Sequence, residues 1–252
     1  MANLALPRRR TIGPLSVIEV AAGPEAPADR RAPGTWTAGG EAPVIVCFHG
    51  YGADASDLAP LADEVPVSRP VRWIFPDAPF KLGPFMPGRM WFPVDEETLR
   101  QSQILGKPWD LSGVRPAGLD EAQKLAREFL DSLETAPNRL VLGGFSQGSM
   151  LAVELTLRAP EPPLGLFILS GNLVDEPSMK ELAPARAGTP FFQSHGRMDP
   201  LLGYEGAQKL EAALKAAGLV GELYAFAGGH AVPAEAALRL GHFLDGLFGA
   251  FH

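Results

Sequence analysis

A serine between glycines follows a short apolar run near the middle of the chain. Residues 144–148 read G-F-S-Q-G, directly after the run Leu140–Leu142 and before a nearly all-apolar stretch. In a strand–turn–helix context, such a turn lifts the serine hydroxyl above a sheet, beside helix amides that favour negative charge. The pattern predicts that Ser146 is a nucleophile. The alternative is a serine that only caps a helix after a glycine turn.

A serine hydroxyl needs a general base, and histidine is the usual base near neutral pH. His230 follows the apolar run Leu223–Phe226, and Asp199 follows the run Phe191–Ser194. Ser146, Asp199 and His230 therefore occur in the chain order of α/β-hydrolases, each on its own loop at one expected sheet edge. The joint placement predicts His230 as the base and Asp199 as the residue that orients it. Taken singly, Asp199 would be a turn residue and His230 a helix cap.

The remaining histidines are weaker candidates for the base. His49 is expected to tie down its own loop, and His195 to shape the loop that carries Asp199. His242 falls within the expected last helix, and His252 ends the chain.

Acyl transfer also needs N–H donors aimed at the developing oxyanion. The backbone N–H of Gln147, directly after the nucleophile, is expected to be one donor. The second is expected to be the N–H of Tyr51, because Gly50 and Gly52 flank it after the run Val44–Phe48 and permit close backbone approach. The same loop lacks the three-glycine spacing of a dinucleotide site.

Short apolar runs alternate with stretches of helical periodicity along the chain, which predicts an α/β fold with a mostly parallel central sheet and helices on both faces. The expected strands are Leu15–Val20, Val44–Phe48, Val71–Phe75, Leu140–Leu142, Leu166–Leu169, Phe191–Ser194 and Leu223–Phe226. The expected helices are Leu119–Leu133, Met150–Leu157, Ala207–Ala217 and Pro233–Phe248. We expect residues 1–252 to form a single domain, in which 1–43 hold a divergent N-terminal strand and connection.

One segment interrupts this alternation. Pro76–Gly118 spans 43 residues with seven prolines and five glycines, and it contains five Phe and Trp residues. Disordered segments are poor in aromatics, so an ordered substrate loop over the sheet edge is expected. Its proposed apolar wall for substrate is Leu82, Phe85, Met86, Met90, Trp91 and Phe92. The alternative is that the aromatics only anchor the loop.

Composition excludes several classes of protein. The net charge of −7 and a pI of about 5.3 do not suit binding to nucleic acid or to an anionic membrane. The lone Cys47 excludes an intrachain disulfide and a cysteine-based zinc site. Arg8–Arg10 are expected to be a solvated basic tail, because no apolar core of an export signal follows them. A cytoplasmic protein without stable membrane association is expected.

These motifs resemble the phospholipase/carboxylesterase group of α/β-hydrolases, which includes acyl-protein thioesterases. The resemblance extends from about Val44 to Phe248. Its motifs are F-H-G-Y-G-A at 48–53, P-D-A-P at 76–79, N-R-L-V-L-G-G-F-S-Q-G-S at 138–149, H-G-R-M-D-P-L at 195–201 and G-H at 229–230. By position, it implies the triad Ser146, Asp199 and His230 with N–H donors from Tyr51 and Gln147. The family often has a valine-proline pair where this chain has Leu202-Gly203.

The resemblance implies a serine carboxylic-ester hydrolase that acts on small or medium acyl esters through an acyl-enzyme. Thioesters and lysophospholipids fall within the same range. No metal or organic cofactor is expected, and the partner is a small-molecule ester; a homodimer is left open. The alternatives are a non-catalytic ligand-binding relative, a serine peptidase, and a dienelactone-hydrolase-like enzyme, which usually has cysteine where Ser146 stands.

Overall fold

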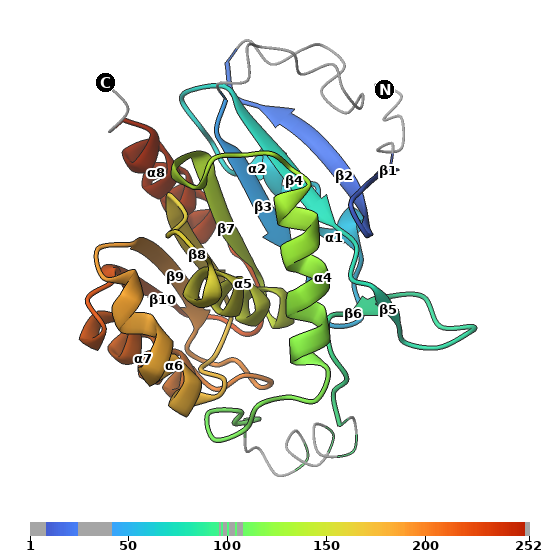
Figure 1. The fold of residues 1–252 in the computed structure, drawn as a ribbon. Helices are drawn as coiled ribbons and strands as arrows, with labels where there is room; N and C mark the ends of the chain where they lie inside the picture. Colours follow the sequence, from blue (N-terminus) through green and yellow to red (C-terminus); the bar gives the residue numbers. More distant parts are fainter. Residues whose placement is uncertain are drawn as a thin grey trace.

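An eight-stranded sheet runs through the computed structural model, which describes residues 9–24, 42–95, 97, 100, 104 and 108–249 (Figure 1). The strands are β1 (Arg9–Ile12), β2 (Leu15–Ala22), β3 (Val44–Phe48), β4 (Val71–Pro76), β7 (Leu140–Phe145), β8 (Gly165–Leu169), β9 (Pro190–Gly196) and β10 (Val220–Phe226). Their spatial order is β1-β2-β4-β3-β7-β8-β9-β10. In this order, β4, β3, β7, β8, β9 and β10 run parallel to one another, and β2 is antiparallel to both β1 and β4.

Helices cover both faces of the sheet (Figure 1). One face carries α4 (Leu119–Asp131), α5 (Gln147–Arg158), α6 (Glu176–Leu182) and α7 (Tyr204–Ala216). The other carries α1 (Ala55–Leu58), α2 (Leu61–Glu64) and α8 (Ala234–Gly249). Single 3₁₀ turns, η1 (Pro137–Arg139) and η2 (Ala183–Arg186), precede β7 and β9. The sheet thus separates two apolar clusters, one under each helix layer.

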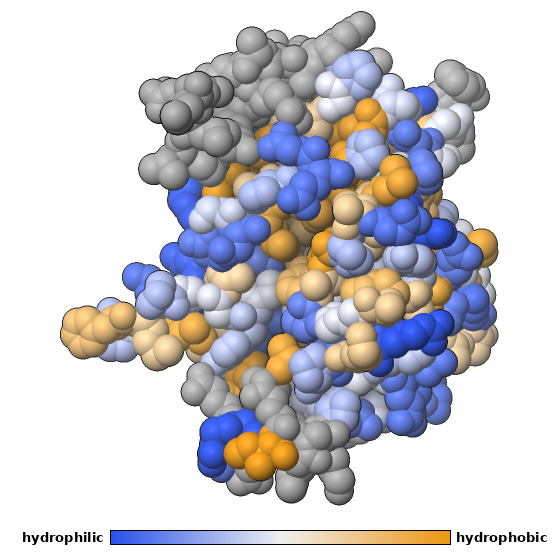
Figure 2. Space-filling view, turned by 180° about the vertical axis from the view of Figure 1, so that it is seen from behind, coloured by the Kyte–Doolittle hydropathy of each residue, from blue (hydrophilic) through white to orange (hydrophobic). Residues whose placement is uncertain are grey.

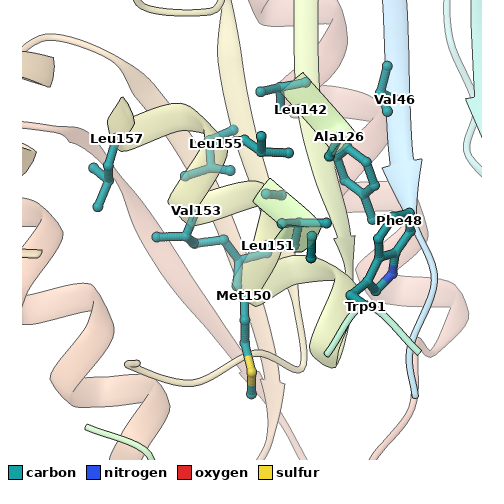
Figure 3. Packing of buried hydrophobic residues seen from close by; sticks show 14 of the residues in the cluster. Val46, Phe48, Trp91, Ala126, Leu142, Met150, Leu151, Val153, Leu155 and Leu157 are labelled. Atoms are coloured by element: carbon teal, nitrogen blue, oxygen red, sulfur yellow. The ribbon is translucent and has the colours of Figure 1, made fainter. Parts of the chain in front are cut away.

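The centre of the sheet explains why its strands are apolar without alternation. Every residue of β3 and β8 is buried, because helices cover both of their faces. Helix α5 is buried from Gln147 to Leu157, and Figure 3 shows its side chains packed against β3 and β7. Strand register pairs Phe48 with Gly144, so the loop after β3 and the turn after β7 leave the sheet side by side.

The expected central strands and long helices are all present, and several reach further than their apolar runs. Strand β7 continues through two glycines to Phe145, so it ends one residue before Ser146. Strand β9 continues through His195 to Gly196, directly before the loop that carries Asp199. The short elements β1, α1, α2 and α6 were not predicted, because four to seven residues carry too little periodicity.

The expected basic tail is wrong for two of its arginines. Arg9 and Arg10 belong to β1, which pairs with β2. Arg9 forms ion pairs with Asp77 and Asp54, and Arg10 with Glu19 at 2.6 Å. The three acidic partners come from β2 and from the loops after β3 and β4, so only the folded chain brings them to the arginines. Residues 1–8, including Arg8, and 25–41 lie outside the described residues.

The proline-rich segment after β4 begins with a hairpin of β5 (Phe80–Lys81) and β6 (Arg89–Met90). The hairpin projects from the side of the molecule, and its tip is apolar (Figures 1 and 2). Phe85 at the tip is 96% exposed. Immediately after β6, Trp91 and Phe92 are completely buried.

Candidate active site

Ser146 sits in a strained turn between β7 and α5. Its backbone has φ 55° and ψ −123°, a region that non-glycine residues rarely occupy. Its amide donates to Leu169 O at 2.8 Å, and its carbonyl accepts from the amide of Ser149 at 3.0 Å. Those bonds hold the turn at the carboxyl edge of the sheet. The side chain therefore begins at the N-terminus of a buried helix, where backbone amides and the helix dipole favour an anion.

Close backbone approach explains the glycines on both sides of Ser146. A Cβ on Gly144 would lie 2.5 Å from Phe48 O, and one on Gly148 would lie 2.1 Å from the same oxygen. A Cβ on Gly50 would lie 3.3 Å from the Cβ of Ser146. The loop after β3 therefore runs directly past the turn of Ser146, as the predicted oxyanion donor Tyr51 requires.

Asp199 and His230 are joined by a hydrogen bond of 2.7 Å between Oδ2 and Nδ1. A carboxylate only accepts, so Nδ1 carries a proton, and in the neutral form of the ring Nε2 is the nitrogen that can accept one. The other oxygen, Oδ1, accepts from the amides of Leu201 and Leu202 at 2.9 Å each. Burial alone would raise the pKa of Asp199, but His230 and these amides outweigh it and lower that pKa. Asp199 is thus an oriented, ionised partner for His230.

His49 holds the loop after β3 in place, as expected. Its Nδ1 lies 2.7 Å from Gly50 O, and its Nε2 accepts from the amide of Ala78 at 2.9 Å. The carbonyl of His49 accepts from Nε1 of Trp91 at 2.9 Å. Burial lowers the pKa of His49, so the ring is neutral with its proton on Nδ1. The proposed donor Tyr51 follows this pinned glycine.

The hairpin fixes the other end of the same loop. The amide of Gly52 donates to Arg89 O at 2.8 Å, and the amide of Arg89 donates to Ala53 O at 2.9 Å. Gly88 has a φ of +94°, and a Cβ there would lie 2.1 Å from Gly52 O. Strand β6 is therefore in direct backbone contact with the loop that carries Tyr51.

The side chain of Gln147 has a role that the sequence did not reveal. It is 3% exposed, and its Oε1 accepts from the amide of Trp91 at 2.9 Å while its Nε2 donates to Phe92 O at 2.8 Å. The G-F-S-Q-G motif specified glutamine, but not its partner across the fold. Gln147 thus places one backbone N–H at the nucleophile turn and ties the proline-rich segment to α5 with its side chain.

A pocket of about 180 Å³ opens beside these residues. Ser146, His230, Tyr51 and Gln147 all line it, so four of the five predicted catalytic residues share one cavity. Its remaining walls are Gly50, Ala53, Val94, Trp109, Phe145, Met150, Leu201 and Leu202. The lining is mostly apolar, which suits a hydrocarbon chain.

None of the six residues predicted to form the substrate wall lines this pocket. Trp91 and Phe92 are buried in the core, where the ring of Trp91 packs edge-on against Phe48 with centroids 5.2 Å apart (Figure 3). Leu82, Phe85, Met86 and Met90 lie on the hairpin. The prediction placed the whole segment over the site, whereas its first part folds back on itself and projects away. The expected anchoring role describes Trp91 and Phe92 better.

The apolar walls of this pocket include Phe145 at the end of β7 and Val94, together with side chains from three further places. Met150 lies one helical turn after Ser146, a spacing that puts both on one face of α5, and Figure 3 shows its side chain directed away from the cluster around Leu142. Leu201 and Leu202 follow Asp199 in its loop. Trp109 belongs to the later part of the proline-rich segment, and its amide donates to Leu201 O at 3.0 Å. Helical spacing alone could have found Met150.

No cluster of three or more His, Cys, Asp or Glu side chains among the described residues could hold a metal ion. None of the described helices is long and apolar enough to span a bilayer.

Comparison with known proteins finds relatives that are named as esterases or thioesterases, or as members of one phospholipase/carboxylesterase family. The family model described as Phospholipase/Carboxylesterase matches residues 37–247. The chain is 33% identical over 194 residues to acyl-protein thioesterase 1 of Mycosarcoma maydis, covering 68% of this chain and 75% of that protein. The crystal structure of Zea mays acyl-protein thioesterase 2 covers 82% of this chain and 94% of its own, with a TM-score of 0.64 at 25% identity. That of esterase PE8 covers 90% and 99%, with a TM-score of 0.69 at 28% identity.

The family match covers most of the chain and includes every residue of the pocket. The α/β-hydrolase fold and the ester-hydrolase class predicted from the sequence are confirmed, and the alternative of a non-catalytic relative is not favoured. The chain belongs to the phospholipase/carboxylesterase family.

Proposed function

We propose that this protein cleaves acyl esters or thioesters in two steps, through an acyl-enzyme on Ser146. Ser146 attacks the acyl carbonyl while Nε2 of His230 accepts its proton, and Asp199 orients the imidazole and stabilises its cation. The bond to the alcohol or thiol then breaks, and His230 gives its proton to that leaving group. A water molecule that His230 deprotonates attacks the acyl-enzyme, which releases the carboxylic acid and restores Ser146. The observation that carries the proposal is the 2.7 Å bond between Asp199 and His230 at a pocket that Ser146 also lines.

The backbone N–H groups of Tyr51 and Gln147 are the proposed oxyanion donors. Gln147 begins α5, so its amide is one of the helix N–H groups without an intrahelical acceptor. Tyr51 lies in the loop that His49 and β6 pin beside Ser146. Loss of one oxyanion donor typically costs about a hundred- to a thousandfold in kcat.

The proposed substrate carries a small or medium acyl chain, because the pocket beside Ser146 is apolar and limited in volume. The name acyl-protein thioesterase among the relatives favours including thioesters. Met150 reaches this pocket, whereas Met90 lies on the hairpin. We expect Met150→Ala to shift the preferred chain of an aryl ester series toward longer acyl groups, and the matched control Met90→Ala to leave the preference unchanged. The reverse pattern would restore the hairpin as the acyl wall.

The decisive test of the mechanism is Ser146→Ala, assayed on a short-chain aryl ester. Removal of a serine nucleophile typically lowers kcat by about 10⁶-fold. A fluorophosphonate probe is expected to label the wild type at Ser146 and to leave the variant unlabelled. Undiminished hydrolysis by Ser146→Ala would refute the serine mechanism. Activity is expected to fall at acidic pH, because His230 must be neutral to accept the proton.

We also propose that the chain forms a single domain and works in the cytoplasm. All described strands except the β5–β6 hairpin belong to one sheet, and Cys47 is buried and free within it. A single unfolding transition, with coincident near- and far-UV signals, would support one domain. Light scattering on the purified protein would decide between a monomer and a homodimer.

A further inference from the structure

A second histidine contacts the catalytic aspartate. His195 lies near the end of β9, and its side chain is completely buried. Its Nε2 is 2.6 Å from Leu202 O and 3.3 Å from Oδ2 of Asp199. That carboxylate oxygen is the one that accepts from His230. Two imidazoles therefore lie within 3.3 Å of a single carboxylate oxygen.

The geometry fixes the protonation of His195. A carbonyl oxygen only accepts, so Nε2 must carry the proton that points to Leu202 O. Burial lowers the pKa of His195, although Leu202 O and Asp199 act in the opposite direction. The ring is thus neutral and donates one N–H without bringing a positive charge to the site.

Few charged groups face this ring. Asp199 and His230 act on it from the site, and the ring of Tyr204, at the start of α7, has its centroid 6.4 Å from that of His195. The guanidinium of Arg197 is stacked over the ring of Tyr204, 4.9 Å from its centroid. The titratable groups that act on His195 are therefore Asp199 and His230, beside the backbone of Leu202 and Gly171.

We propose that His195 is a positioning residue that holds the Asp199 carboxylate in register with His230. The inference rests on the proposed function. Two amides of the loop fix Oδ1, while Nε2 of His195 holds the Leu202 carbonyl and lies 3.3 Å from Oδ2. A neutral donor suits this place, because a charged one would neutralise the carboxylate that must stabilise the His230 cation.

This arrangement is expected to affect how readily His230, paired with Asp199, accepts and releases its proton. The Nε2–H of His195 points to Leu202 O, but its partial positive charge lies 3.3 Å from Oδ2 and offsets some of the negative charge that His230 experiences. It therefore moderates how strongly the imidazole of His230 holds its proton. The same N–H fixes the peptide of Leu202, which forms part of the pocket wall. Loss of His195 is expected to lower kcat more than it raises KM, because the pocket walls other than Leu202 persist while the base loses its alignment.

The test compares His195→Gln with His195→Leu on a short-chain aryl ester between pH 5 and 9. Glutamine places an N–H close to the position of Nε2, whereas leucine fills similar space without a donor. For His195→Leu we expect kcat to fall about 10- to 100-fold with KM within about threefold. We expect the acidic limb of its kcat/KM profile to shift to higher pH by ~0.5 unit. His195→Gln is expected to recover kcat to within about fivefold of the wild type, with the acidic limb restored.

Two outcomes would overturn the inference. One is a folded His195→Leu with wild-type kcat and an unmoved acidic limb. The other is a folded His195→Gln as slow as the leucine variant, which would mean that packing matters and the donor does not. Ser146→Ala, measured in parallel, separates this failure from failure of the proposed function, because only the latter leaves that variant active.

A measurement on the wild type removes any dependence on the folding of the variants. Nitrogen-15 spectra of the histidine side chains are expected to show His195 neutral, with the proton on Nε2, from pH 5.5 to 8. A charged ring at neutral pH, or a proton on Nδ1 instead, would overturn the inference.

Discussion

Trp91 and Phe85 belong to the same proline-rich segment, yet Trp91 is completely buried and Phe85 is 96% exposed. Trp91 packs against Phe48 and has partners for both of its N–H groups, in the carbonyl of His49 and the side chain of Gln147. Phe85 lies at the tip of a hairpin that projects from the molecule (Figure 2). Both residues are aromatic, so their difference in burial comes from the partners that the fold brings to each of them. The base of the hairpin is therefore part of the scaffold of the proposed active site, and its tip is separate from that scaffold.

The largest effect is expected from Trp91→Ala. Replacing a buried tryptophan leaves a cavity and removes the bond to His49, which lowers the free energy of unfolding by about 3–5 kcal/mol. Urea denaturation measures this loss, and Trp91→Phe is the control that keeps most of the volume. If Trp91→Ala changes chain-length preference at unchanged stability, Trp91 is a pocket wall and the comparison fails.

Gln147→Leu is expected to have the next largest effect. It leaves the buried amide of Trp91 and carbonyl of Phe92 without partners, at about 1–3 kcal/mol for each such group. The backbone N–H of Gln147 stays in place, so the measured loss belongs to the side chain. Gln147→Glu, which keeps an acceptor for the Trp91 amide, is expected to lose less in the same urea titration. Wild-type stability in Gln147→Leu would show that the base of the hairpin is held by other contacts.

The far end of the segment is anchored by charge instead of aromatic packing. Arg115 lies 2.7 Å from Glu154 on α5 and 3.0 Å from Asp175, which caps α6. Burial opposes ionisation of Asp175, but bonds from Ser178 and Arg115 outweigh it and lower its pKa. The folded state thus binds this proton less readily than the unfolded chain. The resulting stability is present above the unfolded pKa of about 3.9 and is lost as the pH falls further.

Asp175→Asn isolates this charge, because asparagine also caps helices and tolerates the left-handed conformation found here. We expect about 1 kcal/mol lower stability at pH 7. The fall in Tm between pH 5 and 3 is expected to be shallower than in the wild type. Parallel Tm profiles for the two proteins would mean that the ion pair does not anchor the segment.

The smallest effects are expected at the tip. Phe85→Ser and Met86→Ser are expected to change stability by no more than about 0.5 kcal/mol, because exposed side chains lose few contacts. For a water-soluble short-chain ester, kcat/KM is expected to stay within about twofold of the wild type. A larger drop would connect the tip to the site through β6 and the loop of Tyr51, and would remove the distinction between tip and base.

Features that depend on nearby residues were predictable from the sequence, and features that depend on distant contacts were not. The strand–turn–helix around Ser146 and the loops of Asp199 and His230 each have local signals, and strand order brings them to one edge. The pocket wall was misplaced because Trp109 and Leu201 become neighbours only through a bond between distant loops. The charged partners of Arg9 could not be predicted for the same reason, because Asp54 and Asp77 lie far from it in the sequence. A sequence shows which side chains are apolar, but not which of them a loop turns inward.

The bond from the Trp109 amide to Leu201 O joins the pocket wall to the loop of Asp199, the proposed partner of the base. Leu201 and Leu202 line the pocket, and their amides also hold the Asp199 carboxylate. A substitution that reshapes this wall to admit another acyl group is therefore expected to displace the Asp199 carboxylate as well. Variants that gain a new substrate range by changes on this side of the pocket are therefore expected to have a lower kcat at first. Met150, whose helix carries none of these bonds to Asp199, offers the easier route by which the enzyme can acquire a new substrate.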